Sequence, residues 1–443
     1  MNTLEKKYGL YTAIAMVVGV VIGSGVFFKA DDVLTLTNGN LILALVAWGL
    51  GAFSMIFGSL VFAEFAHRIE KSNGIVDYTE EAYGNKAGYL VGWFNWILYF
   101  SPLTAILAWV SSMYTMILMG SDDPANSVET WIIAAVYMIG MYLINAFSPK
   151  LAGRLQVGTT LIKLIPLVLI GVVGIFSGLI NGVTMSNFSA AASDIGSKSG
   201  TIASAVVATA FAYEGWIIAI TINSEIKDSK KNLPKALTIG AFIVFLTYIA
   251  YFLGISGVLS TDRIVIEADN AVSIAASSMF GSIAASVLTG FVVISCLGTL
   301  NGLVLSTIRL PYSLAVRNQG PMPNVLKEIN FKTKMPLKAA VFSGAVSMAY
   351  LLLWYTSINE IWGRYIGLDE IPIVMVYGLY VFLYIWYMRE FRDLNMLKRF
   401  VIPICALAGS LVILYGGITN PSIGLYLLIS VGILLMGLIF YRK

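Results

Sequence analysis

The sequence contains, between residues 15 and 28, the stretch Ala15-Met-Val-Val-Gly-Val-Val-Ile-Gly-Ser-Gly-Val-Phe-Phe28, an apolar run with two glycines around a serine. Glycine costs about 1 kcal/mol in a helix relative to alanine. Unwound backbone inside a bilayer is tolerated only where it lines a cavity or is buried in protein. We therefore predict a membrane-spanning helix broken at Gly23-Ser24-Gly25, with a small-solute site at the break. The alternative is a packing face of small residues, because Gly19 and Gly23 have the appropriate spacing.

The composition of the whole chain is that of a membrane protein. Of its 443 residues, 58% are hydrophobic and only 12% are charged, whereas a soluble domain carries about 25% charged residues. A bilayer core about 30 Å thick needs about twenty apolar residues in a helix. Twelve runs approach or exceed this length, at residues 10–28, 41–66, 88–119, 131–147, 153–178, 200–221, 236–259, 283–315, 339–357, 365–388, 400–417 and 422–441. Pro372 interrupts the tenth run, and we expect residues 181–200 to form an outer loop.

Lysine and arginine are distributed unevenly between the predicted loops. With the N-terminus in the cytoplasm, 23 of the 28 fall on the inner side and four on the outer side. The remaining one, Lys163, falls within the fifth run. Cytoplasmic loops of membrane proteins carry such an excess of positive charge. The distribution therefore predicts twelve transmembrane helices, with both termini on the cytoplasmic side of the cell membrane.

A second candidate break lies in the sixth run, in Thr209-Ala-Phe-Ala-Tyr-Glu-Gly-Trp216. An acid at the depth of Glu214 is costly, and by default it is functional or paired. The alternative is a buried acid that only holds helices together. Paired interruptions five helices apart indicate an inverted repeat with the substrate site at the breaks. We predict one all-α membrane domain, residues 1–443, with a 5+5 inverted repeat (1–178 and 200–388), broken helices 1 and 6, and two C-terminal helices (400–441).

The chemistry available at such breaks suits an amino acid. A half-helix N-terminus presents free N–H groups and a positive dipole end, which favour a carboxylate. Carbonyl groups freed at a helix end can accept from an ammonium group. One histidine, His67, and two cysteines, Cys296 and Cys405, provide no metal site, no disulfide framework and no catalytic cluster. We expect no enzyme activity, no cofactor and no nucleic-acid partner. A channel would need a polar filter, whereas a sensor with the same fold stays possible.

Four motifs resemble those of the amino acid–polyamine–organocation superfamily, in its L-amino acid transporter branch. They are Gly9-Leu-Tyr-Thr-Ala-Ile14 with Ile22-Gly-Ser-Gly-Val-Phe27; Phe211-Ala-Tyr-Glu-Gly-Trp216; Asn223-Ser-Glu-Ile-Lys-Asp228 with Asn232-Leu-Pro-Lys-Ala236; and Arg309-Leu-Pro-Tyr-Ser-Leu-Ala-Val-Arg-Asn-Gln-Gly320. The resemblance covers nearly the whole chain and is greatest to bacterial alanine/serine/cysteine and serine/threonine exchangers. One departure is Lys71-Ser-Asn-Gly-Ile-Val-Asp-Tyr78, where Asp77 is an added charge near the inner gate.

The resemblance implies roles for individual residues of the two breaks. The Phe211 ring would be an outer gate over the substrate. The hydroxyl of Tyr248 would reach the unwound part of helix 1, and Tyr251 is the competing choice. The backbone groups implied in substrate binding are the N–H groups of Ser24, Gly25 and Val26 for the carboxylate, and the carbonyls near Val21 and of Phe211, Ala212 and Glu214 for the ammonium, with Gly23 in the same unwound segment.

Lys163 lies too deep in the fifth run to reach the interface easily. In sodium-coupled relatives Na⁺ sits between helices 1 and 8. The resemblance implies that the Lys163 ammonium takes that place in sodium-independent exchangers. Two alternatives stay open: a purely structural lysine paired with backbone, and a proton carrier with a lowered pKa.

The resemblance implies sodium-independent exchange of small neutral L-amino acids such as alanine, serine and cysteine, by alternating access. Alternatives are a proton-coupled importer and an exchanger of larger neutral amino acids. Helices 3 and 8 offer polar candidates whose orientation the sequence leaves open: Asn95, Ser101, Thr104 and Ser295-Cys-Leu-Gly-Thr299. Eukaryotic relatives pair with a glycoprotein through a cysteine that residues 120–130 lack. We therefore expect a monomer in the bilayer without a covalent accessory subunit.

Overall fold

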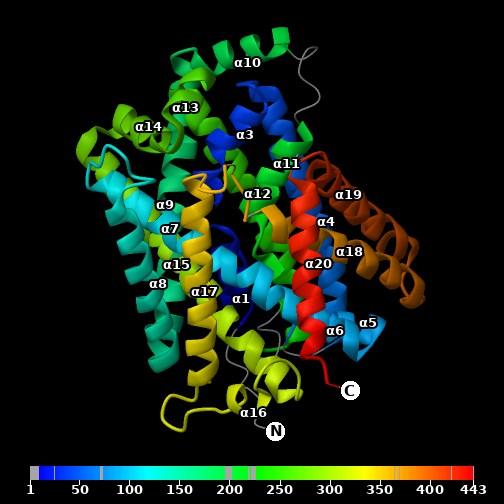
Figure 1. Ribbon diagram of the computed structural model, residues 1–443. Helices are drawn as coiled ribbons and strands as arrows, with labels where there is room; N and C mark the ends of the chain where they lie inside the picture. Colours follow the sequence, from blue (N-terminus) through cyan, green and yellow to red (C-terminus); the bar gives the residue numbers. More distant parts are fainter. Residues whose placement is uncertain are drawn as a thin grey trace.

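In the computed structural model every regular element of the described residues is a helix (Figure 1). The structure describes residues 9–23, 25–69, 73–194, 202–217, 220, 226–363, 365–368, 370–420 and 422–442. The N-terminal helices are α1 (Leu10–Val21), α2 (Gly25–Phe28), α3 (Ala30–Leu36), α4 (Leu41–Arg68), α5 (Ile75–Tyr83), α6 (Asn85–Phe94), the π-helix η1 (Asn95–Phe100), α7 (Ser101–Leu118), α8 (Val128–Phe147), α9 (Pro149–Ile180) and α10 (Val183–Asp194). The C-terminal helices are α11 (Ile202–Tyr213), α12 (Ser229–Val258), α13 (Thr261–Glu267), η5 (Ala268–Asn270), α14 (Ala271–Phe280), α15 (Ser282–Val316), α16 (Pro323–Leu326), α17 (Leu337–Ile358), α18 (Glu370–Glu390), η6 (Leu397–Val401), α19 (Ile402–Thr419) and α20 (Ile423–Ile439).

The helices confirm a multi-pass membrane protein. Within the described ranges, nine helices are long and apolar enough to cross a bilayer, and the bent pair Leu10–Val21 and Gly25–Leu36 would make a tenth. Two shorter apolar helices, α11 and α20, lie in the sixth and twelfth predicted runs. A helix thus overlaps each predicted run, while the count of twelve spans and the inverted repeat stay predictions.

Two details of the expected helix boundaries are wrong, and one predicted loop contains a helix that we did not expect. The first run continues past residue 28, because α3 carries the helical path to Leu36. The segment expected as an outer loop contains the twelve-residue helix α10. The tenth helix begins at Glu370, so Pro372 lies in its first turn rather than interrupting it. Proline is tolerated there because the first turn has no intrahelical acceptor for its missing N–H.

Glycines let α9 and α12 pack at backbone distance. A methyl group at Gly171 would lie 3.1 Å from the carbonyl carbon of Ala250, and one at Gly174 would lie 2.6 Å from that of Gly254. In a bilayer such close van der Waals packing, rather than the hydrophobic effect, holds helices together. Since α12 also packs against α1 and α4, it connects the first broken helix to the surrounding helices.

The predicted inner segments gather at one end of the molecule and the predicted outer segments at the other. Figure 1 shows α16 and the C-terminus at one end, and α3, α10, α13 and α14 at the other. At the first end, Arg68 on α4 pairs with Asp393 at 2.6 Å. At the second end, Asn187 on α10 donates to the carbonyl of Ser256 on α12 at 2.7 Å. These contacts agree with helices that alternate in direction along the chain.

Candidate binding site between two broken helices

Helix α1 ends just before the glycines at which we predicted its break. Its last hydrogen bond runs from the Ile22 N–H to the Val18 carbonyl at 2.8 Å, and Ile22 has an extended ψ of 96°. The chain is helical again from Gly25, and the Lys29 N–H donates to the Gly25 carbonyl at 2.9 Å, so α2 leads into α3. Ser24 lies outside the described residues. The structure therefore places Gly23 and Gly25, on either side of it.

Helix α11 also ends where we predicted a break. Its last residue is Tyr213, and Gly215 has φ +105°. That conformation is open to glycine at no steric cost and strained for other residues. Glu214 therefore follows directly on a helix end and lies inside the protein, with only 7% of its surface exposed.

The two breaks cross at van der Waals distance. A Cβ atom built on Gly25 would lie 2.5 Å from the Cα atom of Ala212, and one built on Gly215 would lie 3.3 Å from the carbonyl oxygen of Val20. The approach of one broken helix to the other thus requires glycine at position 25, whereas at position 215 glycine is required by its positive φ. The sequence alone predicted the two breaks, and the structure brings them into one site.

The hydroxyl of Tyr248 on α12 lies between the two breaks. It is 2.9 Å from the carbonyl oxygen of Val21 and 3.0 Å from that of Ala212, and can donate its proton to either. Tyr251, one turn further along α12, instead packs its ring edge-on against Phe27, with 5.2 Å between the ring centroids. Of the two tyrosines proposed from the sequence, Tyr248 is the one that reaches the unwound backbone.

Lys163 reaches from α9 to the broken part of α1. Its side chain is fully buried, and its Nζ atom donates to the carbonyl of Gly19 at 2.5 Å and to the Thr299 hydroxyl on α15 at 3.3 Å. Because the last α1 hydrogen bond ends on Val18, the Gly19 carbonyl is one of those freed at the helix end. The ammonium group therefore lies between α1 and α15, which correspond to the first and eighth predicted runs.

A cavity of about 40 Å³ lies where the breaks meet. Seven predicted or adjacent residues of the breaks line it: Val20, Val21, Gly23, Gly25, Phe211, Ala212 and Glu214. Gly215 of the second predicted break also lines it, as does Thr299, which the sequence named as a candidate of open orientation. The sequence did not single out the remaining lining side chains, which are Tyr99, Leu103, Leu107 and Leu303. Val26, Lys163 and Tyr248 are buried but are not among the residues that line it. The cavity has space for a few water molecules.

The ring of Phe211 lies under a cation at the predicted outer end of the cavity. The Nζ atom of Lys29 is 5.3 Å from the Phe211 ring centroid, and it pairs with Asp32 at 2.9 Å. An ammonium group over an aromatic face is attracted by the ring quadrupole. Lys29 therefore covers the side chain that we predicted as an outer gate.

Glu214 forms a hydrogen bond to a tyrosine that the sequence did not reveal. The Tyr99 hydroxyl donates to Glu214 Oε1 at 2.5 Å, and the Gly215 N–H also interacts with the carboxylate. Tyr99 lies in η1, where the π-helical turn shifts the side chains of the third membrane-crossing helix relative to a regular α-helix. Such turns occur often at functional sites, but nothing in the composition of this apolar run predicts one.

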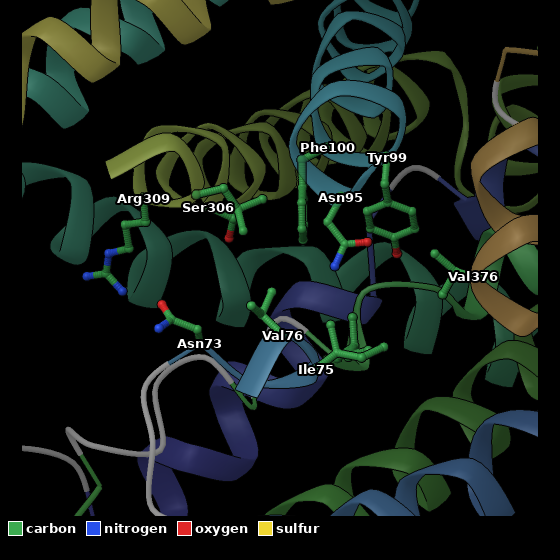
Figure 2. A pocket seen from close by; sticks show the side chains of 11 residues that line it. Asn73, Ile75, Val76, Asn95, Tyr99, Phe100, Ser306, Arg309 and Val376 are labelled. Carbon is green, nitrogen blue, oxygen red and sulfur yellow. The ribbon is translucent and has the colours of Figure 1, made fainter. Parts of the chain in front are cut away.

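The polar candidates on the third helix do not face the breaks. The Ser101 hydroxyl donates to the Trp96 carbonyl, and the Thr104 hydroxyl donates to the Phe100 carbonyl, both at 2.7 Å. Asn95 lines a different cavity, of about 60 Å³, whose walls also include Tyr99. Figure 2 shows Tyr99 at one end of this second cavity and Arg309 and Asn73 at the other. Tyr99 therefore lies in the wall of both cavities, between the site at the breaks and the second cavity.

The charge at Asp77, where the sequence departs from the related motif, is fully buried and paired. Its carboxylate accepts from the Asn73 N–H at 2.7 Å and forms an ion pair with Arg317 at the end of α15. This pair connects α5 to the end of α15 at the predicted inner end.

Comparisons of the sequence with known proteins identify the family of this chain. The sequence profile of a family described as amino acid permeases matches residues 8–441. The serine/threonine exchanger SteT of Bacillus subtilis is 32% identical over 439 residues, which cover 98% of this chain and 95% of that protein. The Asc-type amino acid transporter 1 of Mus musculus is 29% identical over 371 residues, covering 81% of this chain and 67% of the relative. The b(0,+)-type amino acid transporter 1 of Mus musculus is 27% identical over 445 residues, covering 99% and 88%.

The resemblance that the motifs suggested is thereby confirmed. The profile covers almost all of the chain, and one relative exceeds 30% identity along nearly the full length of both proteins. This chain therefore belongs to the amino acid permease family, whose members are transporters and not enzymes.

Proposed function

We propose that this protein exchanges small neutral L-amino acids, such as alanine, serine and cysteine, across the cell membrane by alternating access and without sodium. The observation that carries the proposal is the crossing of the two helix breaks around one cavity. Val21, Ala212 and Glu214 line that cavity, and Gly25 begins the next helical segment. Freed carbonyls and a half-helix N-terminus together match the two charged groups of a zwitterion.

Each proposed contact uses backbone groups of the breaks. The substrate carboxylate would accept from the N–H groups of Ser24, Gly25 and Val26, at the start of the helical path through α2 and α3. The ammonium would donate to the carbonyls of Val21, Phe211, Ala212 and Glu214. A carbonyl oxygen has two lone pairs, so those that accept from Tyr248 can accept a second hydrogen bond.

Lys163 supports sodium independence. Its ammonium group contacts α1 through the Gly19 carbonyl and α15 through Thr299, which is the place that Na⁺ takes in sodium-coupled relatives. A fixed cation there supplies the charge that Na⁺ would otherwise bring. The alternatives, a structural lysine or a proton carrier, differ from this in their response to sodium and pH.

The size and charge of the cavity favour small neutral substrates. Leu103, Leu107 and Leu303 narrow it, and Phe211 lies over it. Glu214 is the one acid among its lining residues. The 32% identical relative is named as an exchanger of serine and threonine, which agrees with exchange of small amino acids. We also propose the twelve-span inverted-repeat topology with cytoplasmic termini, a monomer, and no covalent accessory subunit.

Counterflow in liposomes tests this function. Vesicles containing the purified protein are loaded with unlabelled alanine, and entry of labelled serine is followed in choline buffer. We expect entry that depends on internal amino acid and is unchanged by sodium. A proton-coupled importer would instead need a pH gradient and no internal substrate. If no neutral amino acid enters faster than into protein-free vesicles, the proposed function is wrong.

A further inference from the structure

The side chain of Glu214 offers the cavity a hydrogen-bond acceptor that the proposed contacts to the substrate backbone do not use. Glu214 is more than nine-tenths buried and lines the cavity at the breaks. Its Oε1 atom accepts from Tyr99. Apart from the interaction with the Gly215 N–H, its Oε2 atom is buried without a hydrogen-bond partner in the part of the chain that the structure describes.

A buried carboxylate oxygen without a donor is costly. A carboxylate has about four acceptor positions on its two oxygens, and leaving one buried and unpaired costs its full desolvation penalty. Groups of this kind in a native structure require an explanation, often an ordered water or a ligand. When the carboxyl group is ionised it only accepts, and the missing partner is then a donor.

The Glu214 carboxylate and the carbonyls of Val21 and Ala212 bond to different side chains. The carbonyls of Val21 and Ala212 face Tyr248 on α12. The Glu214 side chain reaches instead to Tyr99 on η1, beside the second cavity. A zwitterion held by the backbone of the breaks would thus have its side chain, rather than its ammonium, available to Glu214.

We propose that Glu214 Oε2 accepts a hydrogen bond from the side-chain hydroxyl of the substrate, which makes the site selective for serine and threonine over alanine and valine. The remaining cavity wall near Glu214 is apolar, with Leu103, Leu107 and Leu303. A buried acceptor in such a wall discriminates against substrates without the hydroxyl, because binding them leaves the acceptor unpaired. This inference rests on the proposed function and specifies its substrate class.

Paired competitors test the inference. In counterflow with labelled alanine, half-inhibitory concentrations are measured for serine against alanine and for threonine against valine, which has nearly the same shape as threonine. We expect serine and threonine to bind at least about tenfold more tightly than their partners, the effect of one hydrogen bond to a charged group. In Glu214→Met both ratios should fall to about one, because the hydroxyl of serine or threonine then has no charged acceptor.

Two further variants keep the test decisive. Glu214→Gln preserves size but replaces the charged acceptor by a neutral amide, whose hydrogen bond to the substrate hydroxyl is weaker, so both ratios should fall there too, even if the methionine variant fails to fold. Glu129→Gln changes an exposed acid at the start of α8 and should keep the native ratios. Native ratios in both Glu214 variants, or an equal loss for all four competitors, would overturn the inference. Absence of counterflow in the native protein would instead refute the proposed function.

Discussion

Gly25 is the position at which one methyl group should separate the two breaks. A Cβ atom there would lie 2.5 Å from the Cα of Ala212, whereas ordinary contact begins at 3.4 Å, so the breaks must move apart by about 0.9 Å. The obstacle is backbone and cannot rotate away. Overpacking of this kind costs about 1–3 kcal/mol.

This cost falls on the conformation in which the breaks meet around the substrate. Conformations in which the breaks are further apart do not pay the overpacking cost. Substrate affinity in Gly25→Ala should therefore fall about fivefold to 150-fold. The assay is binding of labelled serine to the purified protein, with counterflow as the second readout. The matched control is Gly140→Ala on α8, where a Cβ atom would meet nothing within 4 Å. Equal affinity for serine in the native protein and both variants would refute the close crossing of the breaks.

Three further predictions concern charged groups. Lys163→Met keeps the apolar stem but removes the donor to two buried acceptors, and each acceptor costs about 1–3 kcal/mol when it is left unpaired. We therefore expect a lower melting temperature and little counterflow. Exchange at the native rate would contradict the proposed role of Lys163. Burial, and then the charge of Asp32, raises the pKa of Asp269 to about 7, against the opposing effect of Lys29. The stability of the folded protein should therefore fall as pH rises from about 4 to about 7 and then level off. In melting curves between these pH values, Asp269→Asn should lose that slope. Arg317→Met leaves the buried Asp77 carboxylate without its ion-pair partner and should lower the free energy of unfolding by up to about 3–5 kcal/mol. The double variant with Asp77→Asn should recover most of the melting temperature. No recovery would mean that the two residues are not coupled.

The fold was largely predictable because the bilayer imposes its own length and polarity. Every apolar run of the sequence is overlapped by a helix, since backbone in hydrocarbon must satisfy its hydrogen bonds internally. The breaks were predictable for the same reason, because Gly23, Gly25 and Gly215 are conspicuous in otherwise good helices. The ends of helices were less so. Helix α10 was not predicted because its small and polar residues show no helical period of hydrophobicity.

The residues that line the site were predictable only where they belong to the helix breaks. Residues of the breaks follow from the breaks themselves, whereas Tyr99, Leu103 and Leu303 depend on the rotation of helices that are apolar on all sides. No hydrophobic period distinguishes their faces. For Tyr99 the π-helical turn of η1 shifts the face as well. A polar residue in such a helix therefore identifies a candidate, but its contacts depend on packing that one sequence does not contain.

The donors that hold the break explain how it can be stable and still serve transport. Ending α1 at Val21 frees carbonyls that hydrocarbon cannot solvate. Side chains of other helices donate to these carbonyls instead, since Lys163 bonds to that of Gly19 and Tyr248 reaches that of Val21. A bound Na⁺ could hold the same backbone, but it dissociates into either compartment and so couples transport to its gradient. A lysine ammonium cannot leave. In the proposed exchanger the break is thus stabilised in every step of the cycle, and the driving force must come from the amino acids exchanged.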